Sequence, residues 1–253
     1  MFTGYDFGYS WWLTRGHLIV FAVFALLALV AWRRQWRAWI TAIVALLALW
    51  GLAGTLIVHQ VLLFNKPGEL PTPQFLPAGS GRVLDLGAGS GRATLMVALA
   101  RPRAMVTALD LYQGYFGIEN NTPERLMANA RVAGAADRVN VKVADMRDLP
   151  FENGTFDAAL SAFAIDHLPR NDIPVALNEA ARVLKGGGQF LYLGLNADMY
   201  VRIAFPPFHG HAGFWHRSET AEKWRALLSD AGFEIMSVGT QPGTTWVLGQ
   251  KKG

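Results

Sequence analysis

The sequence predicts an α/β fold, in which a doubly wound, mostly parallel sheet with an antiparallel last strand follows an apolar helical hairpin. Beyond residue 80, strand-length apolar runs alternate with helix-length segments, the pattern of a parallel sheet covered on both faces. Residues 1–65 instead contain two long runs without charged side chains. A proline-rich stretch separates these parts. We therefore divide the chain into a hairpin (1–65), a linker (66–80) and an α/β domain (81–253).

The N-terminal runs, Gly16–Trp32 and Ala38–Asn65, are predicted to be helices. As a helix of about 1.5 Å per residue, the second run would reach about 42 Å, more than the ~30 Å hydrocarbon core of a bilayer. The first run is long enough only if its helix starts near Trp11. We expect a membrane anchor. The alternatives are a buried hairpin of a soluble protein and a cleaved signal peptide, which normally has a basic start.

The linker contains Pro67, Pro71, Pro73 and Pro77, which stiffen it. Beyond it, strands are predicted at 82–86, 104–109, 139–144, 158–163, 189–195, 234–238 and 244–248. Helices are predicted at 91–100, 123–133, 173–184 and 219–230. Thr122 and Ser218 are the expected N-caps of the second and fourth of these helices. The last two strands are joined by a Gly- and Pro-containing turn, which predicts an antiparallel hairpin.

The first strand of the domain runs into the motif D-x-G-x-G-x-G, formed by Asp85, Gly87, Gly89 and Gly91. Glycines permit a tight strand-to-helix turn and let backbone N–H groups approach a ligand that a Cβ would repel. Dinucleotide enzymes commonly use G-x-G-x-x-G instead. This spacing makes an NAD or nucleotide-sugar enzyme the less favoured interpretation.

Two carboxylates follow the next two strands, Asp110 after the second and Asp145 after the third. In open α/β sheets, ligands bind beyond the carboxyl ends of the strands, near the point where the strand order reverses. The alternatives for the single residues are a solvated Asp110 and an Asp145 that caps a turn. Their joint placement at consecutive strand ends favours a binding site.

These motifs resemble the class I S-adenosylmethionine (SAM) dependent methyltransferases of the small-molecule type, similar to quinone C-methyltransferases. Segments 156–161 and 179–188 resemble the later motifs of the family. The resemblance implies a Rossmann-like sheet and SAM as cofactor, with Asp110 accepting from the ribose hydroxyls and Asp145 from the adenine amino group. Asp85 would orient the loop or the methionyl amine. The implied cofactor residues are Asp85, Gly87, Ala88, Gly89, Gly91, Asp110, Leu111, Asp145, Met146 and Ser161.

Asp166 and His167, just beyond the fourth strand, are the candidate catalytic residues, because a base assists when the acceptor must lose a proton. The structural alternative for His167 is a helix-start or packing residue. Segment 196–217 is aromatic and predicts an apolar lip for the acceptor, with Tyr112–Asn121 as another wall. The three histidines of segment 196–217, His209, His211 and His216, lack carboxylate companions, so we predict no metal site.

The composition excludes several functions. There are no cysteines, which rules out disulfides, thiolate metal sites and cysteine nucleophiles. The net charge is +3 over residues 1–65 and only +1 over the remainder, which argues against a nucleic-acid surface. We expect a membrane-attached methyltransferase acting on a lipophilic small molecule: a quinone, lipid, phenol or thiol. The alternative is a non-catalytic membrane protein that binds SAM or serves as a scaffold.

The topology has two possible solutions. SAM is made in the cytoplasm, so the α/β domain is expected to face it. Two full membrane spans would then place Arg33, Arg34 and Arg37 outside, against the positive-inside tendency. A hairpin that enters only the inner leaflet would leave these arginines at anionic headgroups. Gly51 and Gly54 would allow a homo-oligomer through the N-terminal helices.

Overall fold

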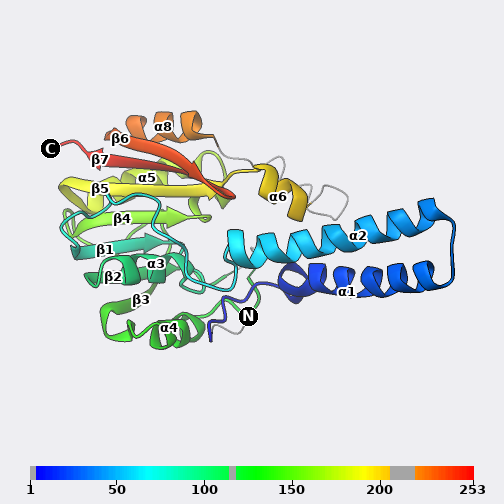
Figure 1. The fold of residues 1–253 in the computed structure, drawn as a ribbon. Coiled ribbons are helices and arrows are strands. Elements are labelled where there is room, and N and C mark those ends of the chain that lie inside the picture. The colour runs from blue at the N-terminus through cyan, green and yellow to red at the C-terminus, as the bar shows by residue number, and fades with distance from the viewer. Residues whose placement is uncertain (1–3, 114–117, 206–219) are drawn as a thin grey trace.

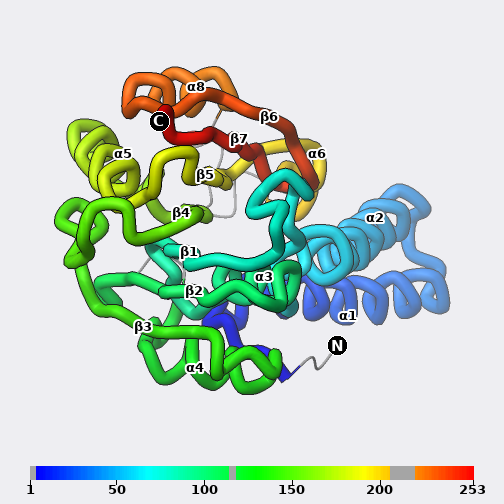
Figure 2. The backbone as a smooth tube through the Cα atoms, turned by 90° about the vertical axis from the view of Figure 1, so that its left-hand side faces the viewer, coloured from blue at the N-terminus to red at the C-terminus, as the bar shows by residue number. Residues whose placement is uncertain are grey.

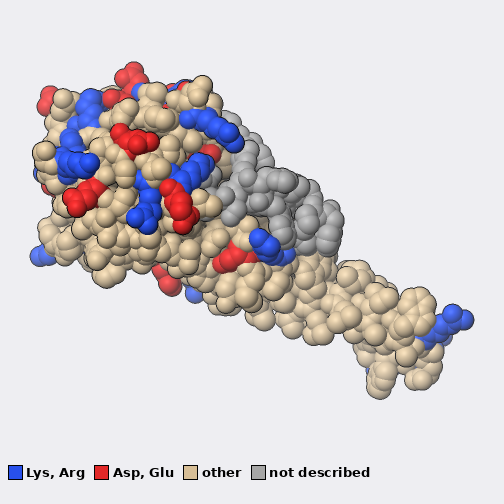
Figure 3. All heavy atoms as spheres, turned by 90° about the horizontal axis from the view of Figure 1, so that it is seen from above, with Lys and Arg blue, Asp and Glu red and all other residues tan. Residues whose placement is uncertain are grey.

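A long helical hairpin projects from a globular α/β part in the computed structural model, which describes residues 4–113, 118–205 and 220–253 (Figure 1). The hairpin consists of α1 (Trp11–Arg33) and α2 (Ala38–Leu56), and α2 continues into a π-helical turn, Ile57–Val61. By length and composition, both helices could cross a membrane. On the side seen in Figure 3, the outer part of the hairpin shows no charged side chain up to the arginines at its tip, and Arg15 is the one charged residue of α1 before Arg33.

The two hairpin helices approach each other closely at two glycines of α2. A Cβ on Gly51 would lie 2.5 Å from the backbone nitrogen of Phe21, and one on Gly54 would lie 2.0 Å from the ring of His17. Small residues allow such close approach of membrane helices. Gly51 and Gly54 are therefore buried against α1 of the same chain, rather than exposed for the homo-oligomer contact that we expected from the sequence.

The predicted sheet is confirmed, with seven strands in the order β3-β2-β1-β4-β5-β7-β6 (Figure 2). The strands are β1 (Ser80–Leu86), β2 (Arg103–Asp110), β3 (Val139–Val143), β4 (Phe156–Ala162), β5 (Leu184–Leu195), β6 (Phe233–Gln241) and β7 (Thr244–Lys251). The first five are parallel, whereas β7 is antiparallel to both β5 and β6. The strand order reverses between β1 and β4, which places the expected binding crevice there.

Helices cover both faces of the sheet. On one face lie α3 (Arg92–Ala100) and α4 (Pro123–Val132), and on the other lie α5 (Asp172–Val183) and α8 (Ala221–Asp230). The helix predicted to start at Gly91 begins one residue later, because Gly91 is the left-handed N-cap of α3. Thr220 caps α8. Ser218, the predicted cap, lies outside the described residues.

The linker packs against the α/β part. Phe75 and Leu76 are buried in the core. The Leu76 N–H donates to Oε1 of Gln189 at 2.7 Å, and Nε2 of Gln189 donates to the carbonyl of Gln74. These bonds fix the linker to β5.

A short helix, α6 (Met199–Ala204), follows β5 and packs on the hairpin. Nε1 of Trp50 donates to the Ile203 carbonyl at 2.7 Å, and Nε2 of His17 is hydrogen-bonded to the Ala204 carbonyl at 2.7 Å. Phe205 is buried among hairpin residues. The remainder of the predicted acceptor lip, including its three histidines, lies outside the described residues.

Candidate functional site

A cavity lies at the carboxyl ends of the parallel strands, beside the point where the strand order reverses. The loops after β1, β2, β3 and β4 all contribute to it. Its lining residues are Gly87, Gly89, Leu109, Asp110, Leu111, Gln113, Ile118, Asn121, Ala144, Asp145, Met146, Arg147, Phe163, Ala164, His167 and Leu168. Polar groups at strand ends and apolar side chains therefore share one site, as in small-molecule pockets generally.

The glycine-rich loop turns sharply after β1, and two of its positions require glycine. Gly87 has a φ of +78°, and a Cβ there would lie 2.3 Å from the Cβ of Ala164. Gly91 has a φ of +90°, and a Cβ there would lie 2.9 Å from Cγ of Leu126. The N–H groups of Gly87 and Ala88 both donate to the Leu109 carbonyl, which ties the turn to the end of β2.

Asp110 connects the two loops that enclose the cavity. Its Oδ2 accepts from the Gly89 N–H at 2.9 Å, and its Oδ1 accepts from the Tyr112 N–H at 2.6 Å. A carboxylate has about four acceptor positions, so each oxygen can accept a further hydrogen bond from a ligand. Burial, followed by the nearby charge of Asp110, raises the pKa of the Tyr112 phenol above its usual range. Tyr112 is therefore a neutral hydroxyl beside this carboxylate.

Asp145 is paired within its own loop. Nε and Nη2 of Arg147 donate to its carboxylate, and the Arg147 N–H donates to Oδ1 at 2.9 Å. These bonds hold the pKa of Asp145 below its usual range. Arg147 also pairs with Asp172 at the start of α5, at 2.6 Å. Asp145 thus caps a turn, the alternative considered from the sequence, and it also lines the cavity.

Asp85 lies beneath the loop, with no exposed surface. Its Oδ2 accepts from the Thr94 hydroxyl at 2.6 Å, whereas its Oδ1 has no hydrogen-bond partner among the described residues. Burial raises the pKa of the Asp85 carboxyl to about 7, although the Thr94 hydrogen bond opposes this shift. A cation placed above the loop would favour the ionised form of this carboxyl and so lower its pKa.

Known proteins share this motif set and fold. Residues 83–188 match the family described as "Methyltransferase domain". The chain is 37% identical over 116 residues to the ubiquinone/menaquinone biosynthesis C-methyltransferase UbiE of Syntrophotalea carbinolica, covering 46% of this chain and 44% of that protein. It is 37% identical over 142 residues to the demethylmenaquinone methyltransferase of Clavibacter sepedonicus, 51% of each chain. The chain thus spans about half the length of these relatives.

Solved structures show the same fold. A SAM-dependent methyltransferase described as putative from Methanococcus maripaludis superimposes with a TM-score of 0.54 and 20% identity, over 69% of this chain and 78% of that one. An O-methyltransferase family protein from Burkholderia thailandensis gives 0.57 and 16%, over 82% and 60%. Residues 83–188 therefore match a methyltransferase domain, and the α/β part has the fold of SAM-dependent methyltransferases. These similarities imply SAM as the cofactor.

The cavity of the methyltransferase domain fits SAM chemically. SAM carries hydroxyls and an amino group that donate, a sulfonium and an ammonium that are cationic, and an adenine ring that is flat and apolar. Asp110 and Asp145 offer carboxylates at two neighbouring strand ends, while Ile118 and Met146 supply apolar surface. Oδ1 of Asn121 is buried without a hydrogen-bond partner among the described residues and lies in the same wall. These groups would hold the cofactor.

The residues predicted from the sequence fall into two groups. Seven of them line the cavity: Gly87, Gly89, Asp110, Leu111, Asp145, Met146 and the candidate base His167. Asp85, Ala88, Gly91, Ser161 and Asp166 are not among the lining residues. Ser161 is fully buried, where its hydroxyl donates to the Leu86 carbonyl at 2.9 Å and accepts from the Ile165 N–H. It joins β4 to β1 and positions the turn that carries His167, Ile165–His167.

Sequence reasoning missed the apolar residues of the β4 loop and the pairing of Arg147. Phe163, Ala164 and Leu168 line the cavity. Phe163 has a φ of +52°, a conformation that side chains other than glycine rarely adopt. No sequence pattern marks such a residue. The proximity of Asp145 and Arg147 in the sequence was a usable signal, because an Asx-type turn joins positions i and i+2.

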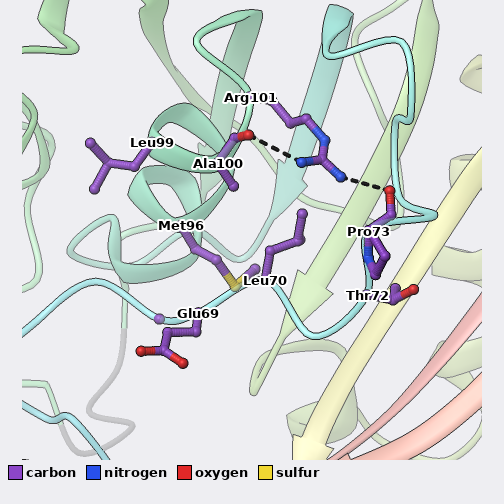
Figure 4. Close-up of a pocket in the computed structure, with 9 residues that line it drawn as sticks. Glu69, Leu70, Thr72, Pro73, Met96, Leu99, Ala100 and Arg101 are labelled. Carbon is purple, nitrogen blue, oxygen red and sulfur yellow. Dashed lines mark hydrogen bonds between the residues drawn. The ribbon is translucent and has the colours of Figure 1, made fainter.

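A second hollow lies between the linker and α3, away from the strand ends (Figure 4). Glu69, Leu70, Thr72, Met96 and Leu99 are among its lining residues. Arg101 also lines it, but its guanidinium donates to the carbonyls of Pro73, Phe75 and Leu76. The hollow is therefore framed by a structural arginine, and we assign the cofactor to the strand-end cavity.

We expect Asp85 to make stability depend on pH. The folded-state pKa of about 7 lies above the ordinary aspartate value of 3.8, so Asp85 ionises at a lower pH in the unfolded chain than in the folded protein. The thermal midpoint of the wild-type chain should therefore fall as pH rises from about 4 to 7 and then level off, because each pKa unit corresponds to about 1.4 kcal/mol. Asp85→Asn should remove this decline, and Asp137→Asn, at an exposed site, should retain it. An unchanged slope in Asp85→Asn would contradict the assignment.

Proposed function

We propose that this chain is a membrane-attached, SAM-dependent methyltransferase whose acceptor is a lipophilic small molecule of the quinone class. The observation that carries the proposal is the placement of the cofactor cavity at the same end of the sheet as the hairpin. The parallel strands point their carboxyl ends towards this end, and α6 follows β5 directly onto α1 and α2 (Figure 1). An acceptor dissolved in a bilayer around the hairpin would meet the site there.

The surface of the hairpin supports membrane attachment. Its tryptophans and leucines are largely exposed: Trp12 and Trp32 by 69% and 65%, Leu26 and Leu46 by 63% each. Exposed apolar surface of this extent marks an interaction site, and no described part of the chain covers it. At about 1.5 Å per residue, the 23 residues of α1 extend about 35 Å, enough to cross a hydrocarbon core of about 30 Å. The tryptophans near the helix ends suit the two interfaces.

The reaction needs little from the protein beyond alignment and exclusion of water. SAM supplies the activated methyl group, which the acceptor takes by in-line displacement. Phe163, Ala164 and Leu168 provide an apolar wall beside the glycine-rich loop, and such a wall excludes water from the reacting atoms. His167 in the same lining would remove the proton from a phenolic or enolisable acceptor.

The names of the two relatives support a quinone acceptor, since both enzymes are named for quinone methylation. The rival proposal of a non-catalytic SAM-binding protein receives less support, because Asp110, Asp145 and His167 all converge on the cavity. The direct test is incubation of the full chain in lipid nanodiscs with labelled SAM, using membrane-lipid extracts and soluble metabolites as separate acceptor pools. Label in demethylated quinones supports the proposal, whereas turnover of polar metabolites alone contradicts it.

We expect His167→Gln to lower kcat about 100-fold or more, because general-base catalysis contributes about 10²–10⁴-fold. The dissociation constant for SAM should stay within about twofold of the wild-type value, since the base acts on the acceptor. Asp166→Asn should have a smaller effect, because Asp166 is not among the lining residues. Single-turnover rates of the His167→Gln and Asp166→Asn variants over pH 6–9 measure the effect on the chemical step. An unchanged kcat in His167→Gln would assign this histidine to packing.

A further inference from the structure

The chain segment that enters the hairpin is bonded to the glycine-rich loop. Phe7 is buried in the core formed with α3 and α4, and its carbonyl accepts from Oγ of Ser90 at 2.8 Å. Asn129 of α4 is 2% exposed. Its Nδ2 donates to the carbonyls of Asp6 and Ser90, and its Oδ1 accepts from the Asp6 N–H. Two buried polar side chains thus hold residues 6 and 7 on the loop.

The same segment then supports a wall of the cavity before it becomes α1. The Gly8 carbonyl accepts from the Glu119 N–H at 2.6 Å, and Tyr9 forms an antiparallel bridge with Ile118. Ile118 lines the cavity. Ser10, the next residue, is the N-cap of α1. Ser10 is therefore the only residue between Tyr9, which pairs with the cavity wall, and Trp11, where the first hairpin helix begins.

The chain segment that leaves the hairpin is bonded to the other side of the loop. Arg92 begins α3, and its Nη2 donates to the Leu62 carbonyl at 2.7 Å and the Leu63 carbonyl at 3.3 Å. Its Nε donates to the Lys66 carbonyl at 3.2 Å. The guanidinium also lies 5.8 Å from the ring centroid of Phe64. The carbonyls that Arg92 binds follow the C-terminal end of the π-helical turn Ile57–Val61. A cation is favoured at the C-terminal end of a helix, where carbonyls remain unsatisfied.

We infer that both ends of the hairpin are part of the cofactor site. Ser90 holds the entering end and Arg92 holds the leaving end, and these residues flank Gly91 in the loop that turns at Gly87 and Gly89. They are positioning residues: they act on SAM through the loop conformation. The hairpin therefore does more than anchor the domain, because the hydrogen bonds at its two ends hold the glycine-rich loop in one conformation. This inference rests on the proposed function only in that the loop binds SAM.

The physical basis is the cost of ordering the loop. A loop restrained from both sides is already in its binding conformation, so less conformational entropy is lost when the cofactor binds. Loss of one restraint leaves a buried carbonyl without its hydrogen-bond donor and frees the loop. Cofactor affinity should therefore fall while the chemical step, once SAM is bound, stays unchanged.

The test uses the full chain in lipid nanodiscs and the variants Ser90→Ala and Arg92→Gln. Each should raise the calorimetric Kd for SAM about tenfold, as expected for about 1.4 kcal/mol, with kcat at saturating SAM and the acceptor KM unchanged. Arg92→Lys, which keeps a cationic donor, should restore most of the affinity. Arg103→Gln is the matched control: Arg103 also donates to a backbone carbonyl, that of Ala78, at the opposite end of β2.

Amide hydrogen exchange separates a local effect from general destabilisation. In Ser90→Ala, a single-atom change, amides 87–91 should exchange faster, while those of β5 keep the wild-type rate. Wild-type Kd values in both variants, or uniformly faster exchange over the whole domain, would overturn the inference and leave the proposed function intact. A wild-type chain with no affinity for SAM would overturn both.

Discussion

Asp110→Ala is expected to lower the affinity for SAM by a factor on the order of 100 or more. Asp110 lines the cavity at the end of β2, and its two oxygens already accept from the N–H groups of Gly89 and Tyr112. The substitution thus removes the proposed acceptor of the ribose hydroxyls and also releases both loops. Hydrogen bonds to a charged group are worth about 1.5–3 kcal/mol each, so the loss of two supports a change of this size.

Calorimetry with SAM and with its demethylated product measures this effect, because the ribose is common to both compounds. The control is Asp230→Ala, which removes an exposed carboxylate at the end of α8, far along the chain from the cavity-lining loops. Asp110→Asn retains one oxygen and should give an intermediate affinity. If Asp110→Ala bound both compounds as tightly as the wild type, the strand-end cavity would not be the cofactor site.

Val23→Asp combined with Leu46→Asp is expected to remove the chain from the membrane fraction. Val23 and Leu46 are 49% and 63% exposed and lie near the middle of α1 and α2. An aspartate at the centre of a membrane helix costs about 2.5–3.5 kcal/mol, whereas the apolar residue that it replaces contributes about −0.3 to −0.6. The pair should therefore weaken insertion by about 6–8 kcal/mol, which is decisive for a two-helix anchor.

The measurement is the fraction of protein that remains with membranes after an alkaline wash, together with liposome flotation of the purified chain. Val175→Asp is the matched control, since Val175 is 45% exposed on α5 of the α/β domain. It should float like the wild type. Flotation of the double variant at the wild-type level would mean that the hairpin is covered by something other than lipid.

Much of the fold could be predicted from the sequence, because its signals are local and periodic. The glycines after β1 and the carboxylates after β2 and β3 mark strand ends, and parallel strands bring their ends to one edge. The segment before α1 carried no such signal. Its bonds join Asp6 to Asn129, 123 positions away, and a single aromatic residue such as Phe7 has no periodicity from which its burial can be read.

The sequence also could not show which residues would contact one another. A stripe of small residues predicts close helix approach, but it fits a neighbour in the same chain as well as one in a second copy. Phe21 and His17 of α1 occupy the space beside Gly51 and Gly54. This contact within one chain depends on the turn at the arginines, which makes α1 and α2 antiparallel. Asp145 likewise had two interpretations from the sequence, and both hold: its Oδ1 accepts from the Arg147 backbone N–H and so caps the turn, and the residue still lines the cavity.

The contact between α6 and the hairpin has one further consequence. Trp50 and His17 of the hairpin are hydrogen-bonded to the carbonyls of Ile203 and Ala204. In the proposed membrane-attached protein, these bonds would hold the α/β domain at one height above the bilayer. Selection among lipid-dissolved acceptors would then depend on the depth of the ring that receives the methyl group. A longer or shorter isoprenoid tail changes only how much of the molecule stays among the acyl chains, so homologues that differ in tail length should react alike.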